Sequence, residues 1–130
     1  MLLNSLNANQ RRAARAVGSA RKALVGLESN GVHVASVFHY GAVDIDPKHL
    51  VVWVLLSGRP DDELPAWLRV TPGLLPGLRP KGIDFDWLLG LREVVVRELA
   101  KRRWPSGDVV DVMVDSEHRV ESSGGWNYFR

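Results

Sequence analysis

The chain of 130 residues contains no cysteine, and this absence excludes several kinds of site. Disulfide bonds, zinc sites with thiolate ligands, cysteine-ligated iron–sulfur clusters and thiol nucleophiles all need the missing side chain. A chain of this length buries roughly two-thirds of its unfolded surface, so it can form a hydrophobic core without a metal or a disulfide. We therefore expect a single domain over residues 1–130.

Long apolar runs are also missing. The longest one, residues 50–56, is far shorter than the roughly 18–20 residues that a membrane helix needs. The chain begins with apolar residues and then turns basic, which is the reverse of the order in a secretory signal. The sequence therefore predicts a cytoplasmic protein without membrane contact.

The net charge of +2 is small, but it is unevenly distributed along the chain. Residues 1–30 and 79–105 carry net charges of +4 and +3, whereas residues 31–78 and 106–130 carry −2 and −3. The two basic segments coincide with the two predicted helices, and the acidic segments coincide mostly with strands and loops. This pattern predicts a basic helical surface and an acidic sheet edge.

Two segments have the periodicity of amphipathic helices. Residues 9–29 place small and aliphatic residues on one side, and Asn30-Gly31 follows as a stop signal. Residues 84–103 have a wider apolar arc, with Asp84 as the predicted cap and a cationic end that suits the helix dipole. We expect this second helix to be the mostly buried centre of the fold. The buried side of the first helix is predicted to consist of Ala13, Val17, Ala20, Leu24 and Leu27.

Residues 32–40 and 49–57 are rich in β-branched and aromatic residues and predict two strands of a hairpin. A hairpin that is symmetric about Asp44 places His39 opposite His49. One face of this hairpin is the more apolar, and we expect it to meet the helices. This face is predicted to carry Val34, Ser36, Phe38, Tyr40, Leu50, Val52, Val54 and Leu56.

Two further strands are predicted, at residues 108–115 and 126–130. Between the hairpin and the second helix, residues 58–82 hold five of the seven prolines and four glycines, which argues against a continuous helix or strand. The segment is nevertheless apolar. We expect it to cover the open side of the sheet, to act as a lid or to form a partner-binding surface.

The predicted order of elements is α-β-β-α-β-β. It indicates an α+β fold, in the form of a two-layer sandwich with about four mainly antiparallel strands and two main helices. A circularly permuted ferredoxin-like sandwich and an antiparallel meander with both helices on one face are the two candidate arrangements.

The predicted hairpin turn gathers two histidines and two acidic residues. Histidine and carboxylate side chains are suitable ligands for zinc, iron or manganese. The alternative is ordinary turn chemistry, in which aspartate side chains bond to the backbone. The candidate metal ligands are His39, Asp44, Asp46 and His49.

Arg92 falls in the middle of the apolar arc of the second helix. A buried arginine needs a partner, because an unpaired buried charge is costly. We expect either an ion pair with an acid on the sheet, such as Asp111, or an aliphatic stem lying on apolar surface with its head in water. The functional alternative is an anchor for an anionic ligand.

The first helix carries basic residues opposite its apolar stripe. Arg11, Arg15 and Lys22 are candidates for binding nucleic-acid phosphates, and the alternative is a solvated helix face. No zinc-finger, RNA-binding or phosphate-loop motif accompanies them.

Acid–base chemistry needs at least two convergent groups. Asp111, Asp115, Glu117 and His118 are candidates near the end of the third predicted strand, but no Gly-x-Ser-x-Gly nucleophile motif is present. We expect no catalytic centre and no cofactor.

The most favoured function is therefore a binding or interaction protein with a protein partner, using Trp67 and Trp126 as anchors. The alternatives are a nucleic-acid-associated protein and a metal-binding protein or enzyme built on the hairpin turn. A monomer is expected, or a homodimer that pairs through an uncovered outer strand.

Overall fold

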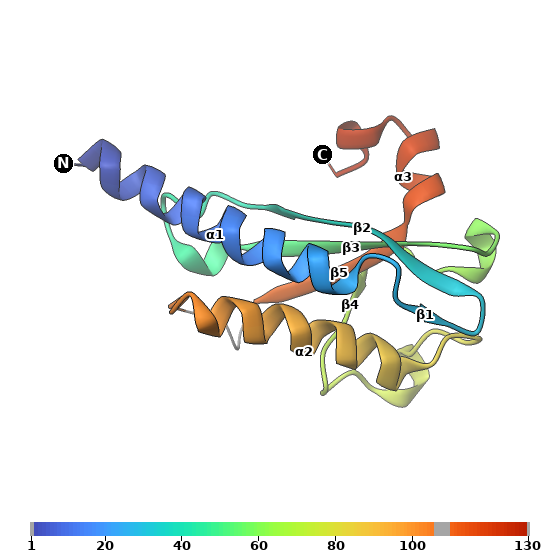
Figure 1. The fold of residues 1–130 in the computed structure, drawn as a ribbon. Helices are drawn as coiled ribbons and strands as arrows, with labels where there is room; N and C mark the ends of the chain where they lie inside the picture. Colours follow the sequence, from blue (N-terminus) through green and yellow to red (C-terminus); the bar gives the residue numbers. More distant parts are fainter. Residues whose placement is uncertain (1, 106–109, 130) are drawn as a thin grey trace.

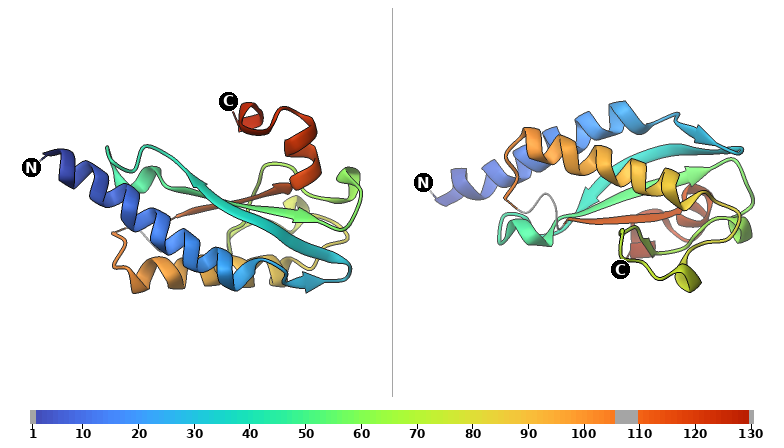
Figure 2. Two further views of the ribbon diagram at one scale, coloured as in Figure 1. Left: turned by 45° about the horizontal axis from the view of Figure 1, so that its top comes forward. Right: turned by 90° about the horizontal axis from the view of Figure 1, so that it is seen from below.

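The computed structural model describes residues 2–105 and 110–129, with the side chains of residues 2–7 and of Trp126 outside the described part. A five-stranded sheet has two long helices on one face and a short C-terminal helical segment on the other (Figures 1 and 2). The predicted α+β class is therefore confirmed. The helices are α1 (Leu2–Leu24), α2 (Phe85–Lys101) and α3 (Glu117–Ser122). The strands are β1 (Glu28–Ser29), β2 (Val32–Tyr40), β3 (Val51–Ser57), β4 (Leu68–Arg69) and β5 (Asp111–Ser116).

The strand order is β1-β2-β3-β5-β4, and the sheet is mixed. β1, β2 and β3 pair antiparallel in sequence, β5 pairs parallel with β3, and β4 pairs antiparallel with β5. A parallel pair needs a crossover, and α2 lies in the connection between β3 and β5. The sheet therefore has one strand more than predicted and a parallel pair at its centre, and the C-terminal segment adds a third layer to the predicted two.

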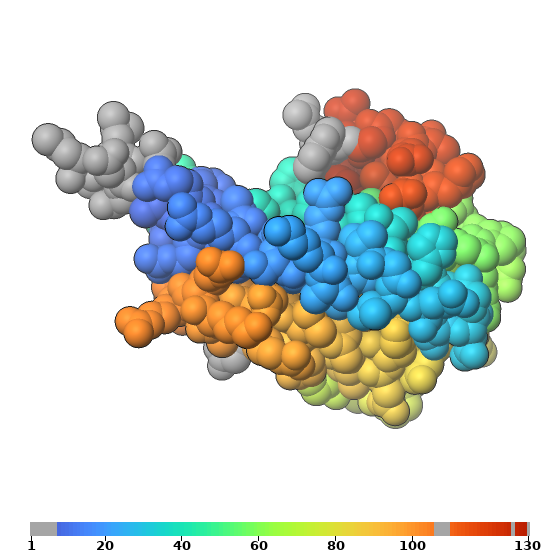
Figure 3. Space-filling view, in the orientation of Figure 1, coloured from blue at the N-terminus to red at the C-terminus, as the bar shows by residue number. Residues whose placement is uncertain are grey.

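The two long helices lie side by side on the same face of the sheet (Figures 1 and 3). The predicted stripe of α1 is buried from Ala13 to Leu24, and its small residues allow close packing. Leu27, the last predicted member, lies beyond the end of the helix and is 42% exposed, so its assignment to the stripe is wrong. Asp84 caps α2 as predicted, because its carboxylate accepts hydrogen bonds from the backbone N–H groups of Asp86 and Trp87. α2 lies beside α1 in the outer layer, not at the centre of the fold. No described helix has the length and apolar composition needed to cross a bilayer.

Asn30-Gly31 does not stop the first helix, which already ends at Leu24. The dipeptide instead forms the two-residue turn between β1 and β2, with φ of 52° at Asn30 and 83° at Gly31. Two consecutive positive φ values are the signature of the hairpin turn that favours Asn-Gly. The same residues therefore carried a hairpin signal that the sequence prediction assigned to a helix end.

The predicted pairing of β2 with β3 is wrong by several residues. His39 lies opposite Val52 instead of His49, and the register shifts by one residue between Val34 and Ser36. A bulge of this kind reverses the side-chain alternation that follows it. Val37 consequently joins the core under the helices, whereas Phe38 and Tyr40 pack on the opposite face. The predicted faces of β3 are correct.

The apolar segment 58–82 contributes both to the sheet and to the core. It supplies the edge strand β4 and the short 3-10 helices η2 (Asp61–Glu63) and η3 (Pro76–Leu78). Leu64 and Val70 are buried in the core, while Leu75 and Leu78 are 65% exposed. Only part of the segment therefore packs against the core.

The last predicted strand is absent from the described residues. After β5 the chain forms α3 and the 3-10 helix η5 (Gly125–Phe129). Ser116 causes this change of direction by capping α3, where its hydroxyl accepts a hydrogen bond from the backbone N–H of Arg119. The C-terminal segment then lies on the face opposite α1 and α2 (Figure 2).

Candidate functional site

An aromatic layer covers the face of the sheet opposite the long helices. Its rings come from β2, β3, the segment after η2 and the C-terminal η5. Trp53 lies at its centre, with ring centroids 4.6 Å from Phe129 and 5.0 Å from Trp67. These spacings fit the tilted and edge-to-face contacts that aromatic rings prefer. The members of the aromatic layer are Phe38, Tyr40, Trp53, Trp67, Tyr128 and Phe129.

A groove of about 390 Å³ opens beside these rings. We call it the aromatic groove. Its wall is mostly apolar, and the carboxylate of Asp111 at its rim is bonded to Arg69, whose Nε lies 2.8 Å from the carboxylate oxygen. Ligand sites are typically concave and apolar with a few polar groups. The groove is lined by Tyr40, Gly41, Val51, Trp53, Trp67, Asp111, Met113 and Phe129.

Trp67, a predicted partner anchor, forms one edge of the aromatic groove. Its side chain is 48% exposed, and its φ of 49° is in the left-handed region that bulky residues avoid. The backbone N–H of Trp67 donates to Oδ2 of Asp115 at 3.0 Å, which holds this conformation in place. The other predicted anchor, Trp126, has a side chain outside the described part of the chain.

Asp115 is a fully buried carboxylate and the centre of a polar network. Besides Trp67, it accepts hydrogen bonds from the hydroxyl of Tyr128 at 2.9 Å and from Nη1 of Arg119 at 2.8 Å. A buried charge is tolerated only when it is paired and hydrogen-bonded in this way. Burial, followed by the hydrogen bond to Asp115, raises the pKa of Tyr128.

Arg119 connects this network to the segment that carries Trp67. Its guanidinium donates to the backbone carbonyl of Pro65 at 3.1 Å, to that of Leu64 at 3.2 Å and to that of Asp61. Three hydrogen bonds from one guanidinium group therefore fasten α3 to the segment that follows β3. The sequence prediction missed this residue. One feature of the sequence could have identified Arg119. It follows Asp115 by four residues, and Asp115 is a charged residue inside an apolar strand.

The predicted acid–histidine pair exists, but with a different acid. Nδ1 of His118 lies 2.8 Å from Oδ2 of Asp61, which comes from η2, and the Ser116 hydroxyl donates to the same carboxylate. The hydrogen bonds from Ser116 and then His118 lower the pKa of Asp61, and the bond to Asp61 raises the pKa of His118.

This arrangement differs from that of an activated serine. Ser116 is fully buried, and its hydroxyl donates to the carboxylate instead of to the histidine. A nucleophile needs a base within hydrogen-bond reach of its own proton and access to substrate. The contacts of Asp61, Ser116 and His118 therefore fit a connection between η2 and α3. Of the other predicted acids, Asp111 bonds Arg69 and Asp115 is buried in its own network.

The four candidate metal ligands do not form a common site. The register places His39 opposite Val52, and Asp46 caps the 3-10 helix η1 (Pro47–His49) by accepting from the backbone N–H of Lys48 at 3.0 Å. Asp44 accepts from the Gln10 amide at 3.5 Å. Within residues 2–105 and 110–129, no three histidine or acidic side chains are grouped so that they could hold a metal ion. These contacts favour the turn-chemistry alternative.

Arg92 is nearly buried, with 12% of its side chain exposed. Its Nη1 lies 3.6 Å from Oε1 of Glu93, the next residue on α2, while Asp111 bonds Arg69. Arg92 and Arg69 both line a small cavity of about 230 Å³ beside the start of β5. The pairing with Glu93 supports the structural interpretation of this residue over the anionic anchor.

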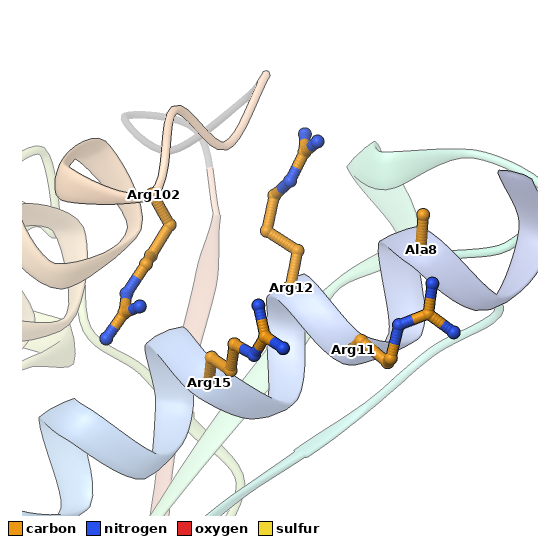
Figure 4. A pocket seen from close by; sticks show the side chains of 5 residues that line it. All are labelled: Ala8, Arg11, Arg12, Arg15 and Arg102. Carbon is orange, nitrogen blue, oxygen red and sulfur yellow. The ribbon is translucent and has the colours of Figure 1, made fainter.

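The predicted basic face of α1 forms part of a second hollow, of about 290 Å³, which we call the arginine groove (Figure 4). Lys22 lies outside it, beside Arg21 in a neighbouring hollow farther along the helix. The spacings of Arg11 and Arg12 to Arg15 make like-charge pairs, each of which destabilises a helix by about 0.2–0.5 kcal/mol. The sequence prediction missed Arg12 and Arg102. The arginine groove is lined by Ala8, Arg11, Arg12, Arg15 and Arg102.

The chain matches no protein-family model, no curated protein and no solved structure. What its surfaces bind is therefore inferred from shape, charge and chemistry. In the part of the chain that the structure describes, the aromatic groove has an apolar character and the arginine groove a basic one.

Proposed function

We propose that this chain is a non-enzymatic interaction protein that binds a protein partner through the aromatic groove. The partner contributes a bulky apolar side chain to the groove and basic residues to the acids of η2 and α3. The observation that carries the proposal is the position of Trp67, which is half exposed and fixed at the edge of an apolar hollow.

The fixed conformation of Trp67 favours binding. Tryptophan is enriched among the residues that dominate interface energetics, and such residues cluster around well-packed pockets. The hydrogen bond to Asp115 and the ring contacts with Trp53 and Phe129 order the Trp67 side chain before any partner arrives. Pre-ordering lowers the entropic cost of association.

The charge around this face favours a basic partner. The three consecutive acids of η2 lie against the start of α3, because Asp61 bonds Ser116 and His118. α3 adds two further acids: Glu121 is exposed, and Glu117 is partly exposed. Complementary charge on a partner increases its rate of association and its specificity.

The edges of the sheet favour side-chain docking over strand addition. β1 and β4, the two outer strands, contain two residues each. Strands this short offer few unpaired backbone groups to another chain, which is how sheet proteins commonly avoid edge-to-edge pairing. A partner that uses this face is therefore expected to insert a side chain into the aromatic groove.

The test is a selection of phage-displayed peptides of about twelve residues on the immobilised chain, followed by affinity measurement of the enriched peptide. We expect the enriched sequences to contain an aromatic or leucine residue flanked by lysine or arginine. Trp67→Ala should lower the affinity for the peptide by at least about tenfold, since dominant interface residues contribute about 2 kcal/mol or more. Val51→Lys, which places a charge in the aromatic groove and leaves Trp67 in position, should do the same.

Leu75→Ala is the matched control, because Leu75 is exposed in the same segment and lies outside the groove lining. It should bind the peptide as the wild type does. If no peptide is enriched, or if the enriched peptide binds Trp67→Ala and Val51→Lys with unchanged affinity, the aromatic groove is not the binding surface.

A further inference from the structure

We propose that the arginine groove is a binding site for phosphate groups. The site is independent of the aromatic groove, because α1 and α2 lie on the opposite face of the sheet from the aromatic layer (Figure 2). Its ligand class is an oligophosphate or the phosphodiester backbone of a nucleic acid, which present the same chemistry to arginine.

Packing of the two long helices brings the two basic segments of the chain together. α1 supplies three arginines to the groove, and Arg102 reaches toward α1 from the C-terminal end of α2 (Figure 4). Nη2 of Arg102 donates to the hydroxyl of Ser19 at 3.0 Å, which fixes its place beside α1. Ala8 completes the lining and is too small to fill the hollow. The two basic segments, which are far apart in the sequence, thus place their positive charges side by side in the folded chain.

Within residues 2–105 and 110–129, no recorded carboxylate forms an ion pair with the arginines that line the groove. α1 contains five basic residues and no acidic residue. On α2, by contrast, Nζ of Lys101 lies 2.7 Å from a Glu98 carboxylate. Like charges at helical spacings of three and four residues lower stability, so an external anion would relieve an unfavourable interaction.

The side chains at the site fit phosphate better than other anions. Guanidinium groups present a planar fork of donors that matches phosphate oxygens, and a hollow with four of them can contact several oxygens at once. None of the described residues that line the groove is aromatic, so we expect recognition without base stacking. The ligand is therefore recognised through phosphates and without sequence preference.

The exposed side of α1 continues the basic surface beyond the groove, where Arg21 and Lys22 line the neighbouring hollow. The stretch from Ala8 to Val25 measures about 25 Å at a helical rise of about 1.5 Å per residue. That length spans several phosphates of one strand, which rise by about 3.4 Å each along the axis of a duplex. A nucleic-acid backbone would therefore contact both hollows, whereas a short oligophosphate would occupy the arginine groove alone.

The experiment compares two double variants that remove equal charge from the same helix. The first variant, Arg12→Gln with Arg15→Gln, removes two of the four arginines that line the arginine groove. The matched control, Arg21→Gln with Lys22→Gln, removes two positive charges outside it. All four side chains are exposed and glutamine is a good helix former, so both variants are expected to fold, which circular dichroism checks. The probes are tripolyphosphate, a fluorescein-labelled oligothymidylate of about twelve nucleotides, and an oligoglutamate peptide of similar charge.

We expect tripolyphosphate or the oligonucleotide to bind, with affinity that falls as salt is added. The groove variant should weaken that binding by at least about tenfold, the factor that corresponds to one lost charge-assisted hydrogen bond. The control variant should have little effect on tripolyphosphate, and it should weaken the oligonucleotide less than the groove variant does, because Arg21 and Lys22 line the neighbouring hollow. A preference for tripolyphosphate identifies a free oligophosphate as the ligand, and a preference for the oligonucleotide identifies a nucleic-acid backbone. Three results would overturn the proposal: neither phosphate probe binds, both double variants weaken binding equally, or oligoglutamate binds as tightly as the phosphate probes.

Discussion

The two faces of the sheet are covered in different ways. Under α1 and α2 the core is almost entirely aliphatic, and the Nε1 atom of Trp104 is the one buried side-chain polar atom without a partner among the described residues. On the other face, a thinner aromatic layer surrounds the buried Asp115 and its hydrogen bonds. β3 belongs to both layers, since neighbouring residues such as Leu55 and Leu56 point to opposite faces.

The difference separates two physical ways of holding a layer on a sheet. Burial of aliphatic surface is non-directional, and two long helices supply much of it on one face. The short segments on the other face bury less, so directional bonds from Asp115 and Arg119 hold them, and they leave a groove open between them. We infer that the helix face provides most of the stability and that the aromatic face provides the binding surface.

The largest effect is expected from the centre of the directional network. Asp115→Ala should lower the free energy of unfolding by about 3–5 kcal/mol, because it leaves the Arg119 charge without its buried partner. Asp111→Ala is the matched control on the same strand, and its exposed pair with Arg69 should contribute only about 0–1 kcal/mol. Urea denaturation measures both. Equal losses would mean that hydrogen bonds do not hold the aromatic layer.

The adjacent leucines of β3 compare the two layers directly. Leu56→Ala opens a cavity under the long helices and should cost about 2–5 kcal/mol of unfolding free energy. Leu55→Ala should cost at least about 1 kcal/mol less, since the cost of a cavity depends on how well its surroundings can collapse. Denaturation of the two variants under one set of conditions gives the difference. A larger loss for Leu55→Ala would reverse the assignment of the faces.

The smallest effect is expected from His118, whose side chain is 79% exposed. Its pKa is raised by Asp61, so its contribution to stability is complete below its ordinary pKa of 6.5 and disappears as the pH rises through the folded value. The lowered pKa of Asp61 gives a contribution that is present above 3.8 and is lost as the pH falls through its folded value. The pair therefore stabilises the fold most between these two ordinary pKa values.

His118→Gln should accordingly lower the melting temperature at mildly acidic pH, and the difference from the wild type should shrink as the pH rises. His49→Gln, the same change at another exposed histidine, is the control for the substitution itself. A difference for His118→Gln that stays constant with pH would show that the bond to Asp61 does not depend on the histidine proton.

Local patterns predicted the elements that depend on neighbours along the chain. The apolar stripe of α1 from Ala13 to Leu24 and the two faces of β3 are confirmed, because helical and strand periodicity determine them. The Asp84 cap is confirmed because it depends on bonds to the next few residues. The bulge after Val34 has no comparable local signal, and it reversed the predicted faces in the second half of β2. The predicted final strand is wrong, because the cap that Ser116 provides redirects the chain into α3.

The candidate site was predictable only in part, for a related reason. Trp67 was identified from its type and its apolar segment, and it lines the aromatic groove. Arg119 and Asp61 were not identified from the sequence, because the contact between them joins residues 58 positions apart. The arginine groove likewise combines two distant helices, and only their packing reveals that Arg102 joins the basic face of α1.

One variant separates binding from stability most clearly: Trp67→Ala, measured both for its free energy of unfolding and for its affinity toward the peptide selected on the wild-type chain. If the aromatic face is the binding surface, the affinity falls by at least about tenfold. The free energy of unfolding should then fall by less than half of the loss caused by Leu56→Ala. If Trp67→Ala instead binds the peptide as tightly as the wild type and is destabilised as much as Leu56→Ala, Trp67 is a core residue and the aromatic groove is not an interface.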